Sequence, residues 1–113
     1  MALALEGLKV VDVSQGVSGP LCAMQLGDLG AEVVKVEPLS GDWLRQIGPF
    51  VKDESGVFLQ LNRNKRSIAV DIKEKQGKDL FKLLAEEADV LVEGYRPKAM
   101  TGLGLGYEAL AAS

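Results

Sequence analysis

The stretch that decides the fold is "VVDVSQGVSGPLCAMQLGDLGAEVVKVE", residues 10–37. The valine-rich run 8–13 predicts a strand, and the small and polar residues 14–19 predict a turn. Residues 20–29 predict a helix, because a proline suits its first position and a glycine follows its last. A second strand is expected at 33–37. Two strands joined so closely by a helix predict a parallel pair with a right-handed crossover.

The rest of the chain predicts further strands and helices in alternation. The expected elements are an irregular segment (38–57), a short strand or helix (58–61), a polar turn (62–66), a strand (67–72), an amphipathic helix (74–88), a strand (89–93) and a pair of short helices after it. This order predicts a single α/β domain, residues 1–113, with an open, mostly parallel Rossmann-like sheet and flanking helices. Ligands of such sheets bind beyond the carboxyl ends of the strands.

The composition argues against several classes of function. Thirteen basic and sixteen acidic residues give a net charge of −3, which argues against nucleic-acid binding. No apolar run is long enough for a membrane span and the first residues lack a secretory signal, so we expect a cytoplasmic protein without membrane contacts. The sequence has no histidine, which removes the commonest general base and the usual zinc ligand. Any chemistry is therefore expected to rest on carboxylates, lysines or the ligand itself.

A dinucleotide site is one interpretation of the first turn. Gly16 and Gly19 have the spacing of the last two glycines of G-x-G-x-x-G, but Ser14 occupies the first position. Glu37, which ends the second strand, stands where an acidic residue would hold a ribose. The alternative is a tight strand-to-helix turn beside a solvated Glu37. The match is partial, and the sequence leaves both interpretations open.

Other reactive side chains are expected to have structural roles. Cys22 shares an apolar helix stripe with Leu26 and Leu29, which predicts a core residue rather than a nucleophile. The carboxylates at or beside strands are expected in hydrogen bonds, namely Asp12, Asp71 and Asp89. Two pairs of cations could either bind an anion or be solvated, namely Lys65 with Arg66 in the polar turn and Arg96 with Lys98 after the last strand.

Three blocks follow one another in the chain: "LEGLKVVDVSQGVSGPLCAMQLGDLGAEVVKVEPLSGDWLRQIGPF", "FLQLNRNKRSIAVDIK" and "ADVLVEGYRPKAMTGLGLGYEAL". Together they closely resemble the beginning of the family III CoA-transferases, a group that includes formyl-CoA transferase, carnitine CoA-transferase and α-methylacyl-CoA racemase. The resemblance extends from Leu5 to Leu110. It implies an enzyme that moves CoA between carboxylic acids through intermediates on an aspartate, or that shifts a proton beside a thioester. It also implies CoA as the ligand, with no metal or redox cofactor.

The resemblance further implies a set of CoA-binding residues. They are Gly16, Val17 and Ser18 in the first turn, Val70 and Lys73 at the end of the third strand, and Gly94, Tyr95 and Arg96 after the fourth. The chain departs from the family at Pro38 and Gly102, where several members have an arginine, and at Gly94, which replaces a frequent asparagine. No catalytic residue is expected within residues 1–113, because the family's catalytic aspartate lies downstream of the last block.

Three functions are therefore weighed for the chain. The first is an amino-terminal part of a CoA-transferase that holds part of the CoA-binding region and is inactive alone. The second is a free-standing protein that binds acyl-CoA or assembles with other subunits, and the third is a dinucleotide-binding oxidoreductase domain. In the first case we expect a homodimer or a complementary carboxy-terminal chain, because a partial core leaves apolar surface to be covered.

Overall fold

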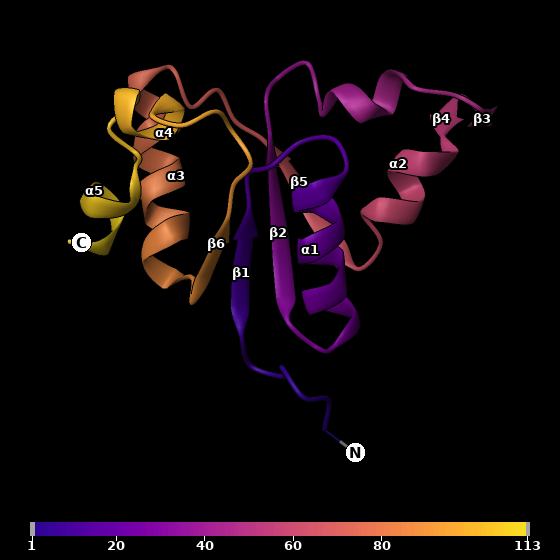
Figure 1. Ribbon diagram of the computed structural model, residues 1–113, viewed down its shortest axis with the longest axis horizontal. Helices are drawn as coiled ribbons and strands as arrows, with labels where there is room; N and C mark the ends of the chain where they lie inside the picture. Colours follow the sequence, from indigo (N-terminus) through magenta and orange to yellow (C-terminus); the bar gives the residue numbers. More distant parts are fainter. Residues whose placement is uncertain (1, 113) are drawn as a thin grey trace.

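The computed structural model describes residues 2–112. Its main sheet has four parallel strands in the order β5-β2-β1-β6 (Figure 1). The strands are β1 (Lys9–Asp12), β2 (Glu32–Glu37), β5 (Lys65–Ala69) and β6 (Val90–Val92). β2 and β5 are added on one side of β1, and β6 then pairs with β1 on its other side, so the direction of strand addition reverses between β5 and β6. This topology confirms the predicted open α/β sheet.

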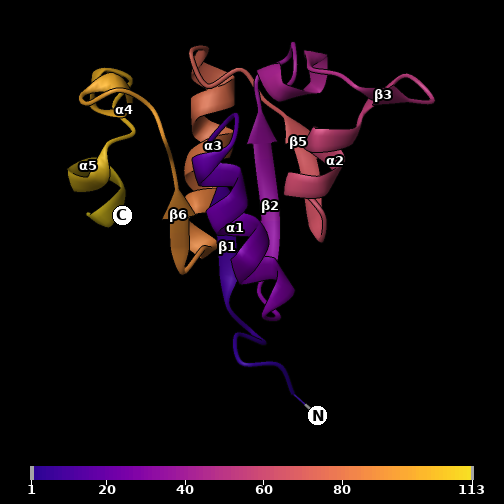
Figure 2. The same ribbon diagram turned by 45° about the vertical axis from the view of Figure 1, so that its right-hand side comes forward.

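Helices cover both faces of the sheet, as Figures 1 and 2 show. Helix α1 (Ser18–Asp28) packs on one face, and α3 (Lys75–Glu87) packs on the other. Two short helices, α4 (Ala99–Gly102) and α5 (Tyr107–Ala111), follow β6 and pack beside α3. Between β2 and β5 the chain forms a 3-10 helix, a hairpin and α2, namely η1 (Trp43–Gln46), β3 (Phe50–Val51), β4 (Glu54–Ser55) and α2 (Gly56–Leu61).

Side chains alternate across the central strand and build a separate core on each face. Val10 packs with Ala23 and Val33 under α1, whereas Val11 and Val13 pack with Phe81 of α3. All six side chains are buried. The valine-rich pattern of β1 is thus explained by a strand that is covered on both sides.

Two expectations about burial were wrong. Cys22 is exposed rather than part of the core, because α1 turns Pro20, Ala23 and Met24 towards the sheet instead. Lys65 was expected in a polar turn, where it could either bind an anion or be solvated, but it begins β5, and its side chain is only 1% exposed. The third strand consequently starts before the predicted residue 67 and ends at Ala69.

Among residues 2–112, none of the helices has the length and apolar character that a bilayer crossing requires.

Candidate substrate-binding site

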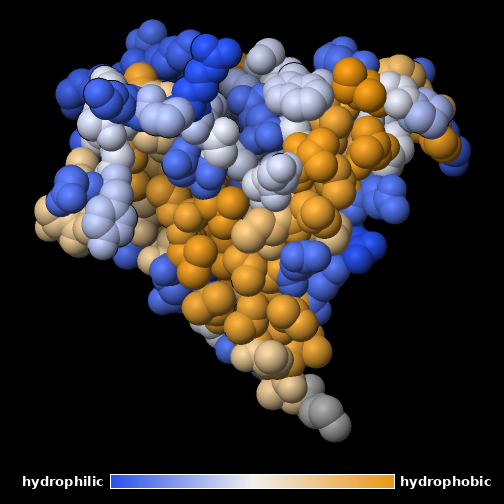
Figure 3. Space-filling model, in the orientation of Figure 1, coloured by the Kyte–Doolittle hydropathy of each residue, from blue (hydrophilic) through white to orange (hydrophobic). Residues whose placement is uncertain are grey.

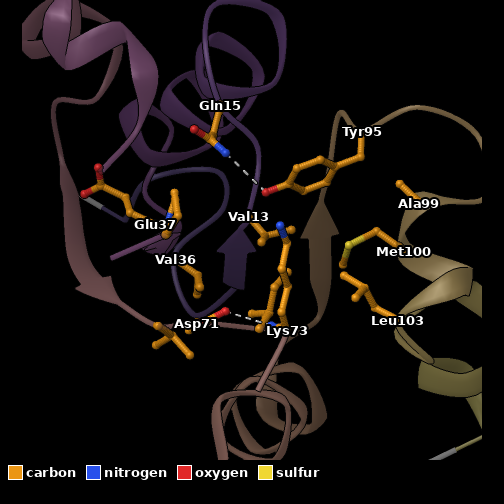
Figure 4. Close-up of a pocket in the computed structure, with 13 residues that line it drawn as sticks. Val13, Gln15, Val36, Glu37, Asp71, Lys73, Tyr95, Ala99, Met100 and Leu103 are labelled. Atoms are coloured by element: carbon orange, nitrogen blue, oxygen red, sulfur yellow. Dashed lines mark hydrogen bonds between the residues drawn. The ribbon is translucent and has the colours of Figure 1, made fainter. Parts of the chain in front are cut away.

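A cavity of about 430 Å³ lies at the carboxyl ends of the strands, on the face that α3 covers (Figure 4). Its walls come from the ends of all four strands and from the segment around α4, namely Val13, Gln15, Val36, Glu37, Pro38, Val70, Asp71, Ile72, Lys73, Tyr95, Ala99, Met100 and Leu103. Val13, Val36, Val70 and Met100 are buried and form an apolar floor. This is the edge of the sheet at which parallel α/β folds bind ligands.

The rim of the cavity is polar. Lys73 extends from the end of β5 towards Tyr95, which follows β6 (Figure 4). Gln15 joins this side to the η1 segment: its side-chain amide donates to the Tyr95 hydroxyl at 3.4 Å, and its carbonyl oxygen accepts the backbone N–H of Trp43 at 3.2 Å. The rim therefore places a cation and an aromatic ring above an apolar floor, a combination that suits a ligand with both an anionic group and a flat ring.

The Trp43 side chain, at the start of η1, packs against the turn between β1 and α1, residues 13–17. Gly16 has a φ of +85°, and a Cβ at this position would lie 2.5 Å from a carbon of the Trp43 ring. Glycine is therefore required here by both backbone conformation and space. Val17 and Ser18 are exposed at the start of α1 and do not line the cavity.

The structure brings together only some of the residues that the sequence indicated. Val70, Lys73 and Tyr95 line the same cavity. Arg96 instead lines a second hollow of about 600 Å³ between β6 and α5, and Gly94 lies near Ser14. Sequence reasoning missed Gln15, which links the turn after β1 to the loop after β6. The residue type carries no signal on its own, because only the fold makes Tyr95 its neighbour.

A buried cluster of four charges lies beneath the β1–α1 turn. Lys35 Nζ lies 2.9 Å from a carboxylate oxygen of Asp42 and 3.8 Å from one of Asp12. Lys65 Nζ lies 2.8 Å from the same Asp12 oxygen. The four side chains are at most 1% exposed, and their charges balance. Burial lowers the pKa of Lys65, and the Asp12 carboxylate partly opposes this shift.

Glu37, at the end of β2, is fully engaged by its neighbours. Arg45 donates Nε to one carboxylate oxygen at 2.7 Å and a second nitrogen to the other at 2.8 Å. The Ser67 hydroxyl and the backbone N–H of Asp42 donate to the same carboxylate. Burial opposes ionisation, but these hydrogen bonds and the Arg45 charge together lower the Glu37 pKa to about 2. Glu37 was expected either to be solvated or to bind a ribose, but it forms a structural ion pair with Arg45 instead.

The strand order defines an α/β fold of the doubly wound class, and the cavity lies at the edge of the sheet where such folds bind their ligands. Residues 5–113 match CoA-transferase family III, and the chain belongs to that family. This match confirms the resemblance of the three sequence blocks.

Similar proteins cover nearly the whole chain, but the chain covers only part of them. It is 52% identical over 106 residues to succinyl-CoA:glutarate CoA-transferase of Homo sapiens, covering 92% of this chain and 24% of that protein. It is 38% identical over 113 residues to (R)-2-hydroxy-4-methylpentanoate CoA-transferase of Clostridioides difficile, covering 96% and 28%. The chain thus spans about a quarter of the length of these relatives.

Solved structures agree on the fold. A crystal structure of a hypothetical protein from Mycobacterium tuberculosis matches with a TM-score of 0.91 at 44% identity, covering 98% of this chain and 31% of that one. A CAIB/BAIF family protein from Brucella suis matches with a TM-score of 0.93 at 38% identity, covering 99% and 31%.

Proposed function

We propose that this chain binds CoA for a family III CoA-transferase reaction and supplies part of the CoA-binding region. The observation that carries the proposal is the cavity at the carboxyl edge, where Lys73 and Tyr95 stand over an apolar floor. Membership of the family supports CoA as the ligand proposed for this edge. The proposed CoA-binding residues remain those that the resemblance implied: Gly16, Val17, Ser18, Val70, Lys73, Gly94, Tyr95 and Arg96.

The chemistry of CoA fits the two kinds of surface at this site. The apolar floor and the Tyr95 ring would take the flat adenine, because aromatic rings stack on apolar and aromatic surfaces. Lys73 would pair with a phosphate group through a charge-assisted hydrogen bond. The exposed turn at Val17 and Ser18 offers the first backbone N–H groups of α1 to another part of an extended ligand.

We assign no nucleophile to this chain. Two carboxylates line the cavity, and both already have partners: Glu37 is paired with Arg45, and Asp71 accepts the backbone N–H of Lys73 at 3.0 Å. We propose that the reacting carboxylate comes from polypeptide outside residues 1–113, so that this chain alone binds CoA without transferring it. Its coverage of about a quarter of the human relative agrees with this proposal.

We also propose that the chain associates with a second copy or with a complementary carboxy-terminal chain. Large apolar side chains are exposed on and around α1, and Figure 3 shows apolar surface gathered over this region. They include Val17, Leu29, Trp43 and Leu59. Two relatives are named as subunits, a beta subunit from Chloroflexus aurantiacus and a subunit from Thauera aromatica. Sedimentation that shows only monomers at high concentration would argue against self-association.

Calorimetric titration of the purified protein with CoA tests the proposed function, with NAD as the control ligand. We expect saturable CoA binding and none of NAD. The variant Lys73→Ala should weaken CoA binding by about 1.5 to 3 kcal/mol through loss of one charge-assisted contact. Lys75→Ala, which removes an exposed lysine paired with Asp79, is the matched control and should bind normally. Binding of NAD in place of CoA would favour the dinucleotide-binding alternative.

Two further expectations belong to this proposal. A free-standing acyl-CoA-binding protein would bind acyl-CoA at least as well as CoA and would need no partner chain, so a parallel titration with an acyl-CoA separates this alternative. We also propose a cytoplasmic location, because a single cysteine cannot form an internal disulfide and therefore suits a reducing compartment. Cell fractionation would test it.

A further inference from the structure

The β1–α1 turn is held in place by three successive contacts from β2 and the segment that follows it. The carbonyl oxygen of Ser14 accepts a hydrogen bond from Lys35 Nζ at 3.0 Å. The Gln15 side chain accepts the backbone N–H of Trp43. The backbone N–H of Gly16 donates to both carboxylate oxygens of Asp42, at 3.1 and 3.3 Å.

Asp42 is the centre of this arrangement. Its carboxylate also accepts the backbone N–H of Leu44 at 2.9 Å and pairs with Lys35 at 2.9 Å. Its own backbone N–H donates to Glu37 at 2.8 Å. The Asp42 side chain is 0% exposed, so water cannot replace these partners if they are removed.

The buried charges give this carboxylate its fixed position. Asp42 and Lys35 neutralise each other, and Asp12 and Lys65 form the second pair beside them. Within residues 2–112 every buried side-chain nitrogen and oxygen has a hydrogen-bond partner. A buried ion pair contributes little net stability compared with apolar residues of similar size, but it defines one geometry strongly. The cluster is therefore better explained by the conformation it imposes than by the stability it adds.

We propose that Asp42 is a positioning residue for the substrate: it accepts the Gly16 N–H and so fixes the β1–α1 turn, which in turn orients Gln15 and Tyr95 at the rim of the cavity. This inference rests on the proposed CoA-binding function. If the turn already has its binding conformation in the free protein, less conformational entropy is lost when the ligand binds. Asp42 itself lies outside the cavity lining, so its effect on affinity is indirect.

Two charge-balanced double variants separate loss of the Asp42 acceptor, which serves the N–H groups of both Gly16 and Leu44, from loss of the ion pair. Lys35→Met with Asp42→Ala removes the ion pair and the acceptor for Gly16, whereas Lys35→Met with Asp42→Asn removes the ion pair but keeps an acceptor oxygen. Both leave the Asp12–Lys65 pair intact, so neither leaves an unbalanced buried charge. A third variant, Val33→Ala, removes packing on the same face without touching the turn. Comparison with Val33→Ala therefore distinguishes a general loss of protein stability from loss of the hydrogen bond to Asp42.

The first measurement is hydrogen exchange of the Gly16 amide in the free protein, followed by NMR relative to amides of β1. We expect exchange about tenfold or more faster in the alanine double variant than in the asparagine one, because only the former lacks the acceptor. Val33→Ala should change Gly16 and the β1 amides together. Equal Gly16 exchange in both double variants would overturn the proposal.

The second measurement is CoA affinity of the same proteins. We expect the alanine double variant to bind about tenfold more weakly than the asparagine one, with Val33→Ala close to wild type. Faster Gly16 exchange without a change in affinity would overturn the positioning role and leave CoA binding standing. A wild-type protein that does not bind CoA would refute the proposed function instead, and Gly16 exchange would still decide whether Asp42 holds the turn.

Discussion

Replacing Glu37 by glutamine should destabilise the protein in a pH-dependent way. The carboxylate holds two nitrogens of Arg45, at 2.7 and 2.8 Å, and its pKa is lowered from 4.5 to about 2. Such a shift corresponds to roughly 3 kcal/mol of preference for the ionised form. Because the Arg45 side chain is 41% exposed, solvent screening reduces this value. We expect Glu37→Gln to lower the free energy of unfolding by about 2 kcal/mol at pH 7.

The sign of the pH dependence follows from the lowered pKa. The folded state favours the ionised carboxylate, so the stabilisation is fully present above pH 4.5 and is lost as the pH falls towards 2. Urea denaturation of both proteins at several pH values between 7 and 2 measures the difference, in which contributions from other groups cancel.

The matched control for this experiment lies on the same strand. Glu32 pairs with Arg66, but these side chains are 53% and 71% exposed, so Glu32→Gln should cost less than about 0.5 kcal/mol. Equal effects of the two substitutions at pH 7, or a Glu37→Gln effect that persists at pH 2, would refute the reasoning.

Two further predictions concern packing and are measured by urea denaturation. Phe81→Ala should lower the free energy of unfolding by about 3 to 5 kcal/mol, because the ring is 0% exposed in the core under α3. A loss under 1 kcal/mol, on the order of a surface substitution, would contradict that packing. Gly77→Ala should destabilise although alanine favours helices, since its Cβ would lie 1.7 Å from the Asp71 carbonyl oxygen. Gly102→Ala, in open space within α4, should instead stabilise by up to about 1 kcal/mol. Identical effects of the two glycine substitutions would refute the Asp71 contact.

The order of strands and helices could be predicted from the sequence because each core element carries its own pattern. The first strand, the helix after it and the second strand were each placed within two residues of β1, α1 and β2. The segment between β2 and β5 was expected to be irregular, and it contains η1 and the β3–β4 hairpin. These elements have only two to four residues each, too few for a hydrophobic period to be recognised.

The buried charges were predicted only in part. Asp12 was expected in structural hydrogen bonds, and its carboxylate accepts from Ser14 and Lys65. A signal for its partner was present, because Lys35 interrupts the valine run of β2 and lies opposite Asp12 in the parallel register. Asp42 carried no such signal: it lies in a loop, and only the tertiary fold places its carboxylate against Gly16.

The residues of the candidate site were also predicted only in part. Lys73 and Tyr95 could be placed near the cavity because both follow strands whose carboxyl ends share one edge. Arg96 is the next residue after Tyr95, yet it lines the second hollow, between β6 and α5. Both residues follow β6 in a loop, so sequence proximity alone could not separate their environments.

NMR chemical-shift mapping during titration with CoA tests the central claim most directly. CoA bound in the cavity should shift the amides of Val70, Lys73 and Tyr95, and those of Gln15 and Gly16 in the turn that holds the rim. Amides at the opposite end of the sheet, such as Asp28 and Arg63, should stay unchanged. Shifts confined to Thr101 and Tyr107 in the second hollow, or no shifts at saturating CoA, would contradict the account.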